Sequence, residues 1–228
     1  MLLLAFDTAG PNCAVAVARA GSGGPYILTR AEDHISRGHA ERLPPMVEAA
    51  LATAKADYAD LDRIAVTTGP GSFTGVRVGI AFARGLALAL DIPAIGIGSL
   101  DALAFPLARS GEGTVAALLD AKRGEVYALV RDIASGATLV DAEALSVEEL
   151  ALRLSHARRP FTLTGAGAQL VVDALGGPHV TIAGEAEAPD IADVVALAFD
   201  AETYGPPRPV YARAADARPQ LDKAVARL

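Results

Sequence analysis

Two aspartates, Asp7 and Asp120, each follow a short apolar run and each begin a turn, 113 positions apart. If the two turns face one cleft, the carboxylates could hold a nucleotide-bound magnesium ion, which proteins bind through one or two carboxylates plus phosphates. Aspartate also commonly caps its own turn, which is the alternative role for both residues. The turns contain Thr8, Lys122 and Arg123, which leave little room for a phosphate group. ATP hydrolysis by the chain alone is therefore the less favoured interpretation.

A second candidate site is the glycine-rich segment 66–77, whose sequence is VTTGPGSFTGVR. Gly69 and Gly71 allow a positive φ and a close backbone approach, and Ser72 or Thr74 can cap the helix that follows. The free N–H groups of such a helix start could hold an anion. The segment lacks the Gly-Lys-Ser/Thr of a P-loop and the GxSxG spacing of a nucleophile elbow. An anion site and a tight strand-to-helix turn without a ligand both remain open.

The predicted helix from 76 to 90 is apolar on nearly every side, and Arg77 and Arg84 are its only charged residues. Such a helix must be covered almost all round, by its own sheet or by a partner. Small residues recur at every fourth position and form a smooth stripe: Gly75, Gly79, Ala83 and Ala87. The stripe could pack on the chain's own sheet or against a helix of a second protein. Because a helix has more than one face, both contacts could be present at once.

The order of the predicted elements indicates a duplicated α/β architecture. Apolar runs and turn residues predict, in order, strands at 2–6, 13–18 and 26–30, a helix at 38–55, a strand at 64–68, the apolar helix, a strand at 94–97 and a helix at 99–108. The second half repeats a strand, acidic turn and strand over 115–131, and a strand with a GxG turn at 163–168. We predict two subdomains, 1–110 and 111–228.

Bulk composition excludes several classes of protein. The net charge of −7 and the pI near 5.1 argue against unaided binding to nucleic acid. A single cysteine, Cys13, excludes intramolecular disulfides and cysteine-cluster metal sites. The four histidines are scattered, so no metal site is expected: His34, His39, His156 and His179. The start lacks a signal peptide's basic region, and the apolar run is too short to span a membrane, so a cytoplasmic location without membrane contact is expected.

The stretch VTTGPGSFTGVRVGIAFARGLALALDIPAIGIGSLDALA resembles the signature of the bacterial TsaB (YeaZ) family. This family is the dimerization subunit of the machinery that makes threonylcarbamoyladenosine on tRNA. The segments LLLAFDT, CAVAVA, HAERLPPMVEAAL and DAKRGEVY agree with it, so the resemblance covers about the first 130 residues well and the rest loosely. It implies the duplicated actin-like fold of sugar kinases and chaperone ATPases, with two mixed-sheet subdomains.

The resemblance also implies that this chain is not the catalyst. The family's catalytic paralogue, TsaD, carries a metal-binding His-x-x-x-His pair where this chain has Ser99 and Leu103, which are poor ligands. We therefore expect no catalytic and no metal-binding residues. The implied function is a scaffold for the TsaD-type subunit, which transfers the threonylcarbamoyl group to N6 of the adenosine next to the anticodon, position 37, of tRNAs.

Relatives pair with the catalytic subunit through their first two helices, here 38–55 and 74–91, in an intermolecular four-helix bundle. The expected interface residues are His39, Leu43, Met46, Val76, Gly79, Ile80, Ala83 and Arg84. The residues expected to contact an anion or nucleotide are Asp7, Thr8, Gly69, Gly71, Ser72 and Asp120. No cofactor of its own is expected, with ATP or ADP at the partner interface left open. The other expected associations are a small TsaE-type P-loop ATPase as third component, a homodimer of the chain alone, and tRNA only through the complex.

Two other functions stay open. A stand-alone actin-like ATPase or small-molecule kinase would use Asp7 and Asp120, whereas a metallopeptidase is disfavoured by the missing histidines. The tail departs from the family pattern, because Tyr211-Ala212-Arg213 stands in place of Tyr-Leu-Arg. The basic residues of the tail could contact nucleotide, tRNA or a partner: Arg208, Arg213, Arg218, Lys223 and Arg227.

Overall fold

The computed structural model describes residues 1–109, 112–202 and 205–213 of the 228-residue chain. The elements of the first half are β1 (Leu2–Asp7), β2 (Asn12–Gly21), β3 (Gly24–His34), α1 (His39–Ala54), the 3-10 helix η1 (Tyr58–Asp60), β4 (Arg63–Thr67), α2 (Phe73–Leu90), β5 (Ala94–Ile97) and α3 (Ser99–Ala108). Those of the second half are β6 (Thr114–Lys122), β7 (Glu125–Asp132), β8 (Thr138–Ser146), α4 (Val147–Leu154), β9 (Phe161–Thr164), α5 (Ala168–Leu175), β10 (Val180–Gly184) and α6 (Ile191–Asp200).

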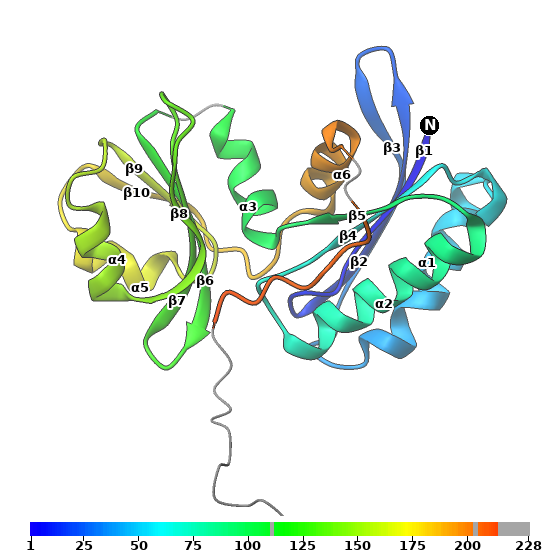
Figure 1. The fold of residues 1–228 in the computed structure, drawn as a ribbon, viewed down its shortest axis with the longest axis horizontal. Coiled ribbons are helices and arrows are strands. Elements are labelled where there is room, and N and C mark those ends of the chain that lie inside the picture. Colours follow the sequence, from blue (N-terminus) through cyan, green and yellow to red (C-terminus); the bar gives the residue numbers. More distant parts are fainter. Residues whose placement is uncertain (110–111, 203–204, 214–228) are drawn as a thin grey trace, which may run out of the picture.

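The strands form two five-stranded sheets with the same topology, one in each lobe (Figure 1). The first sheet has the order β3-β2-β1-β4-β5, and the second has the equivalent order β8-β7-β6-β9-β10. In each sheet the first strand pairs antiparallel with the second and parallel with the fourth. The repeated topology confirms the predicted duplicated α/β fold with two mixed sheets.

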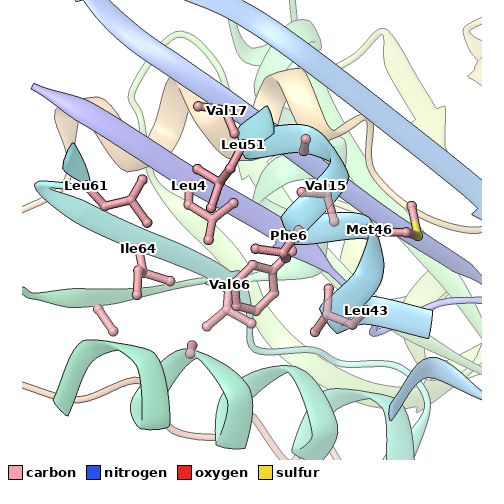
Figure 2. Close-up of a cluster of buried hydrophobic side chains, with 14 of the residues drawn as sticks. Leu4, Phe6, Val15, Val17, Leu43, Met46, Leu51, Leu61, Ile64 and Val66 are labelled. Atoms are coloured by element: carbon pink, nitrogen blue, oxygen red, sulfur yellow. The ribbon is translucent and has the colours of Figure 1, made fainter. Parts of the chain in front are cut away.

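The core of the first lobe follows from the alternation of side chains along β1. Leu4 and Phe6 point to the face of the sheet that α1 and α2 cover, where they meet side chains such as Leu43 and Met46 (Figure 2). Leu3 points to the opposite face, which α6 covers. Because both faces of this strand are covered, its sequence is continuously apolar.

The two lobes exchange one helix each. α3 belongs to the first half of the chain but packs on the second sheet, where Leu100 and Leu103 contact β6 and β7. α6 follows the second sheet but packs on the first, with Val194 and Val195 in the core beneath β1 and β2. Helices from each half of the chain therefore pack on the sheet of the other half. The predicted boundary between residues 110 and 111 lies outside the described residues and stays a prediction.

The small-residue stripe of α2 packs on the chain's own first lobe. A Cβ added at Gly75 would overlap the carbonyl oxygen of Thr8, and one added at Gly79 would overlap the hydroxyl of Thr8. Ala83 is fully buried in the same core. The opposite face of α2 is exposed, so the described chain covers only one side of a helix that its sequence predicts to be covered nearly all round.

α2 also has the length and mean hydropathy, 1.5 over 18 residues, of a segment that could cross a membrane, and it alone has both among the helices of the described residues. Core helices pass the same test, and the buried face of α2 lies along β4 and β5 (Figure 1). The sequence argument that this run is too short to span a membrane is therefore wrong, because α2 begins at Phe73 and has 18 residues. The expected cytoplasmic location stays a prediction.

Gly75→Ala should destabilise the fold, because the new methyl group has no room against the backbone of Thr8. We expect the free energy of unfolding to fall by about 1–3 kcal/mol or more, measured by urea denaturation. Gly85→Ala is the matched control on the exposed side of α2, where an added Cβ meets nothing within 4 Å. It should raise stability by about 0.5–1 kcal/mol. Equal effects of the two substitutions would contradict the described contact.

Candidate functional site

A cavity of about 410 Å³ lies between the lobes, at the point where the two acidic turns approach each other. The first lobe contributes Gly10 and Ser72, and the second contributes Asp120, Lys122 and Tyr127. The structure therefore brings the two turns to one cleft, as the magnesium hypothesis requires. The two aspartates, however, have very different surroundings.

Asp7 is fully buried beneath its turn and does not line the cavity. Its Oδ1 accepts a hydrogen bond from the backbone N–H of Ala9 at 2.8 Å and another from the hydroxyl of Thr67. Its Oδ2 is buried without a hydrogen-bond partner. Burial raises the pKa of the carboxyl above its ordinary value, because the charged form is poorly solvated there. Asp7 thus caps its own turn, which is the alternative that the sequence left open.

Asp120 is partly exposed at the edge of the cavity. Its Oδ1 accepts a hydrogen bond from the backbone N–H of Lys122 and its Oδ2 accepts one from the Lys122 ammonium group, both at 2.7 Å. These hydrogen bonds lower the pKa of the carboxyl. The carboxylate is therefore ionised and already paired with a cation, whereas Asp7 is sealed away. The arrangement does not favour one magnesium ion held by both aspartates.

The glycine-rich segment forms a tight strand-to-helix turn, and the predicted anion contact there stays a prediction. The backbone N–H of Ser72 donates to the carbonyl oxygen of Ala9 at 2.6 Å, and that of Gly75 donates to Ser72 Oγ at 3.2 Å. Thr8 is buried, and its hydroxyl donates to the carbonyl oxygen of Gly75 at 2.7 Å. The chain itself thus takes the N–H groups of Ser72 and Gly75. A Cβ at Gly71 would overlap the Ala9 oxygen, and Gly69 has a φ of +91°, so both glycines serve this turn.

Ser99 lines the cavity, whereas the sequence predicted it as the cap of the helix that runs to Ala108; the N-cap of that helix is Gly98. Ser99 begins α3 with its side chain 1% exposed, and its Oγ has no hydrogen-bond partner. Leu103 packs in the apolar core against the second sheet and offers no ligand atom. Within the described residues, no three of the His, Cys, Asp and Glu side chains lie close enough to hold a metal ion.

Most of the predicted partner-interface residues need correction, because they pack inside the chain. Seven of them are buried in the first lobe: His39, Leu43, Met46, Val76, Gly79, Ile80 and Ala83. His39, for example, lies within 3.2 Å of the carbonyl oxygen of Asn12 through Nε2. Arg84 alone of the predicted set lies on the exposed side of α2.

The exposed face of α2 carries different residues, which share a helical spacing of three or four. Phe73 is 62% exposed and Leu88 is 86% exposed, and Arg77 and Arg84 lie between them on the same side. The sequence contained a signal for this exposed face, because large side chains lie opposite the glycine stripe. Sequence reasoning missed this face because apolar side chains occur on every side of the helix, so the apolar pattern did not mark which side is buried.

Comparison with known proteins places this chain in a family. The family model of TsaD, tRNA N6-adenosine threonylcarbamoyltransferase, matches residues 33–173, which include α1, α2 and the Asp120 turn. The solved structure of YeaZ from Pseudomonas aeruginosa is 31% identical, with a TM-score of 0.75, and the match covers 92% of this chain and 99% of that one. The chain belongs to the TsaB (YeaZ) family.

A TsaB relative from Escherichia coli K12, the tRNA threonylcarbamoyladenosine biosynthesis protein TsaB, is 40% identical over 128 residues. That match covers 56% of this chain and 53% of the relative, so this chain spans about half the length of the curated relatives it matches. The ethanolamine utilization protein EutJ from Carboxydothermus hydrogenoformans shares the fold, with a TM-score of 0.52 at 12% identity, over 87% of this chain and 90% of that one. These likenesses confirm the resemblance and the actin-like fold.

The buried carboxyl of Asp7 predicts a specific pH dependence of stability. The pKa of Asp7 in the folded state lies above the ordinary value of 3.8. The stability that the protonated carboxyl contributes to the fold is therefore fully present below pH 3.8. It is lost as the pH rises through the folded-state pKa. The stability of Asp7→Asn relative to the wild type should therefore increase with pH, measured as urea midpoints from pH 4 to pH 8. Parallel stability curves for Asp7→Asn and the wild type would contradict the assignment.

Proposed function

We propose that this chain is a non-catalytic subunit in tRNA threonylcarbamoyladenosine biosynthesis. It binds and stabilises a TsaD-type catalytic subunit, which transfers the threonylcarbamoyl group to N6 of adenosine 37 in tRNAs. The observation that carries the proposal is the exposed outer face of α2, with Phe73 and Leu88, in a chain of the TsaB family. Large exposed apolar side chains beside arginines are typical of protein–protein interfaces.

Two features of the cleft support a role without catalysis. Asp7 is sealed under the β1–β2 turn, and the N–H groups of Ser72 and Gly75 are taken by Ala9 and by the Ser72 side chain. Ser99 and Leu103 replace the histidines expected of the catalytic paralogue, and Leu103 lies in the core. A reacting nucleotide would find neither a free carboxylate pair nor the metal ligands of that paralogue.

The proposed docking surface consists of the outer face of α2 and the adjoining outer face of α1. The two helices are neighbours on the same side of the first sheet (Figure 1). On α1 the exposed residues include Arg42 and Ala49, and on α2 they include Arg84 and Leu88. Two such helices from each subunit would make an intermolecular four-helix bundle. In the absence of the partner the same surface would pair with a second copy of the chain.

The remaining associations are proposed as follows. A small TsaE-type P-loop ATPase joins the pair as a third component, and ATP or ADP binds at the interface with the catalytic subunit rather than in the sealed turn of this chain. The net charge of −7 disfavours direct tRNA binding, so tRNA is reached through the complex.

Leu88→Asp should abolish the pairing, because it places a charge at the most exposed apolar position of α2. We expect the dissociation constant for the TsaD-type subunit from the same cell to rise at least about tenfold, measured by calorimetry and by light scattering on a size-exclusion column. Leu152→Asp is the matched control, since Leu152 is a leucine on the other lobe that is 73% exposed. Unchanged binding by Leu88→Asp would refute this surface. Gly79→Arg is unsuitable as a test, because Gly79 is buried against Thr8.

The pure chain should show no magnesium-dependent ATP turnover. A turnover that Asp120→Asn abolishes would instead favour the actin-like ATPase, since Asp120 is the carboxylate that reaches the cleft. The measurement is phosphate release by the isolated chain, with Asp33→Asn as the control for a carboxyl outside the cleft.

A further inference from the structure

Residues 205–213 run from the first lobe to the second and make hydrogen bonds with both (Figure 1). On the first lobe, the backbone N–H of Val210 donates to the carbonyl oxygen of Thr68, at the end of β4, at 2.9 Å. On the second lobe, the backbone N–H of Ala144 in β8 donates to the carbonyl oxygen of Ala212, also at 2.9 Å. The segment, which we call the strap, thus joins β4 to β8 through its backbone.

Side chains fasten the strap to α2 in the first lobe. The hydroxyl of Tyr211 accepts hydrogen bonds from Arg77, at 3.0 Å from Nη2 and 3.3 Å from Nε. The Arg77 guanidinium also stacks on Phe73, 3.5 Å from the ring centroid, and the Phe73 and Tyr211 rings lie 6.4 Å apart. Stacking of this kind stabilises the geometry even at an exposed site.

A second set of contacts fastens the strap to the turn that carries Asp120. Arg213 donates from Nη2 to the carbonyl oxygen of Ala121 at 3.0 Å and pairs with the carboxylate of Glu125. Its guanidinium lies 6.0 Å from the ring centroid of Tyr127, which lines the cavity. The strap therefore ends on the second wall of the cleft.

We propose that the strap holds the two lobes at one separation and so fixes the width of the cleft. The acidic turns face each other across a cavity of about 410 Å³, so the cleft's width is not set by contact between them. The strap spans the same gap, with Thr68 and Arg77 at one end and Ala144 and Glu125 at the other. Releasing Tyr211 and Arg213 lets the lobes rotate apart about the packed helices α3 and α6, which stay in contact. This property belongs to the chain alone and does not depend on the proposed partner.

The test measures the distance between the lobes in the isolated full chain. Spin labels are placed at Ala52→Cys on α1 and Gln169→Cys on α5, both exposed, while the native Cys13 is buried and stays unlabelled. Pulsed electron paramagnetic resonance should give one narrow distance distribution with the strap intact. The double substitution Tyr211→Ala with Arg213→Met should broaden it and shift it to longer distances. Tyr26→Ala, at a 48% exposed tyrosine on β3, is the matched control and should leave it unchanged.

Hydrogen exchange gives a second readout at the point where the strap meets β8. In the double variant the Ala144 amide should exchange about tenfold faster, while the amide of the buried Leu4 stays protected and shows that the fold is intact. An unchanged distance distribution together with unchanged Ala144 exchange would overturn the proposal. If the double variant unfolds, the Ala144 exchange rate is measured in Tyr211→Phe instead, because this substitution removes only the hydroxyl that Arg77 binds. Faster Ala144 exchange in that variant supports the strap, and wild-type exchange refutes it.

Discussion

The close approach of α2 to the β1–β2 turn is the contact on which the site depends. Gly71 and Gly75 let the segment and its helix lie against the backbone of Ala9 and Thr8, and Gly79 leaves room for the Thr8 hydroxyl; an added Cβ would collide at each position. The approach allows the hydrogen bonds from Ser72 to Ala9 and from Thr8 to Gly75. These bonds satisfy buried polar groups that would otherwise each cost about 1–3 kcal/mol. They also close the turn over Asp7.

The same contact divides the roles of α2 between its two faces. One face is buried inside the first lobe, where Val76 and Ile80 pack in the core beside β4. The other face is exposed and carries the large apolar side chains Phe73 and Leu88 beside Arg77 and Arg84. A helix whose inner face is tightly seated can present its outer face as a rigid surface, which lowers the entropy lost when a partner binds. The glycine-rich segment thus seats the helix, and the proposed partner would bind the rigid face that results.

The duplication supplies two lobes, and three segments link them. α3 and α6 each pack on the sheet of the opposite half, and the strap crosses between β4 and β8. Asp120 keeps a position on the cleft, whereas its counterpart Asp7 lies sealed beneath the first turn. Equivalent positions in a duplicated chain have therefore acquired different environments, and with them opposite pKa shifts.

The sequence by itself determined the order of the strands and α-helices of the first half, the duplicated α/β fold and the family, because these follow from local signals such as apolar runs and glycine-containing turns. It did not predict β8, α4, β10 or α6, and it left the cap of α2 open between Ser72 and Thr74. Only the tertiary structure decided which face of α2 is buried and whether Asp7 reaches the cleft. Those outcomes rest on contacts between residues far apart in the chain, such as Asp7 with Thr67 and Thr8 with Gly75. In a helix that is apolar on nearly every side, hydrophobic periodicity does not mark the inner face, so the predicted interface included residues that belong to the core.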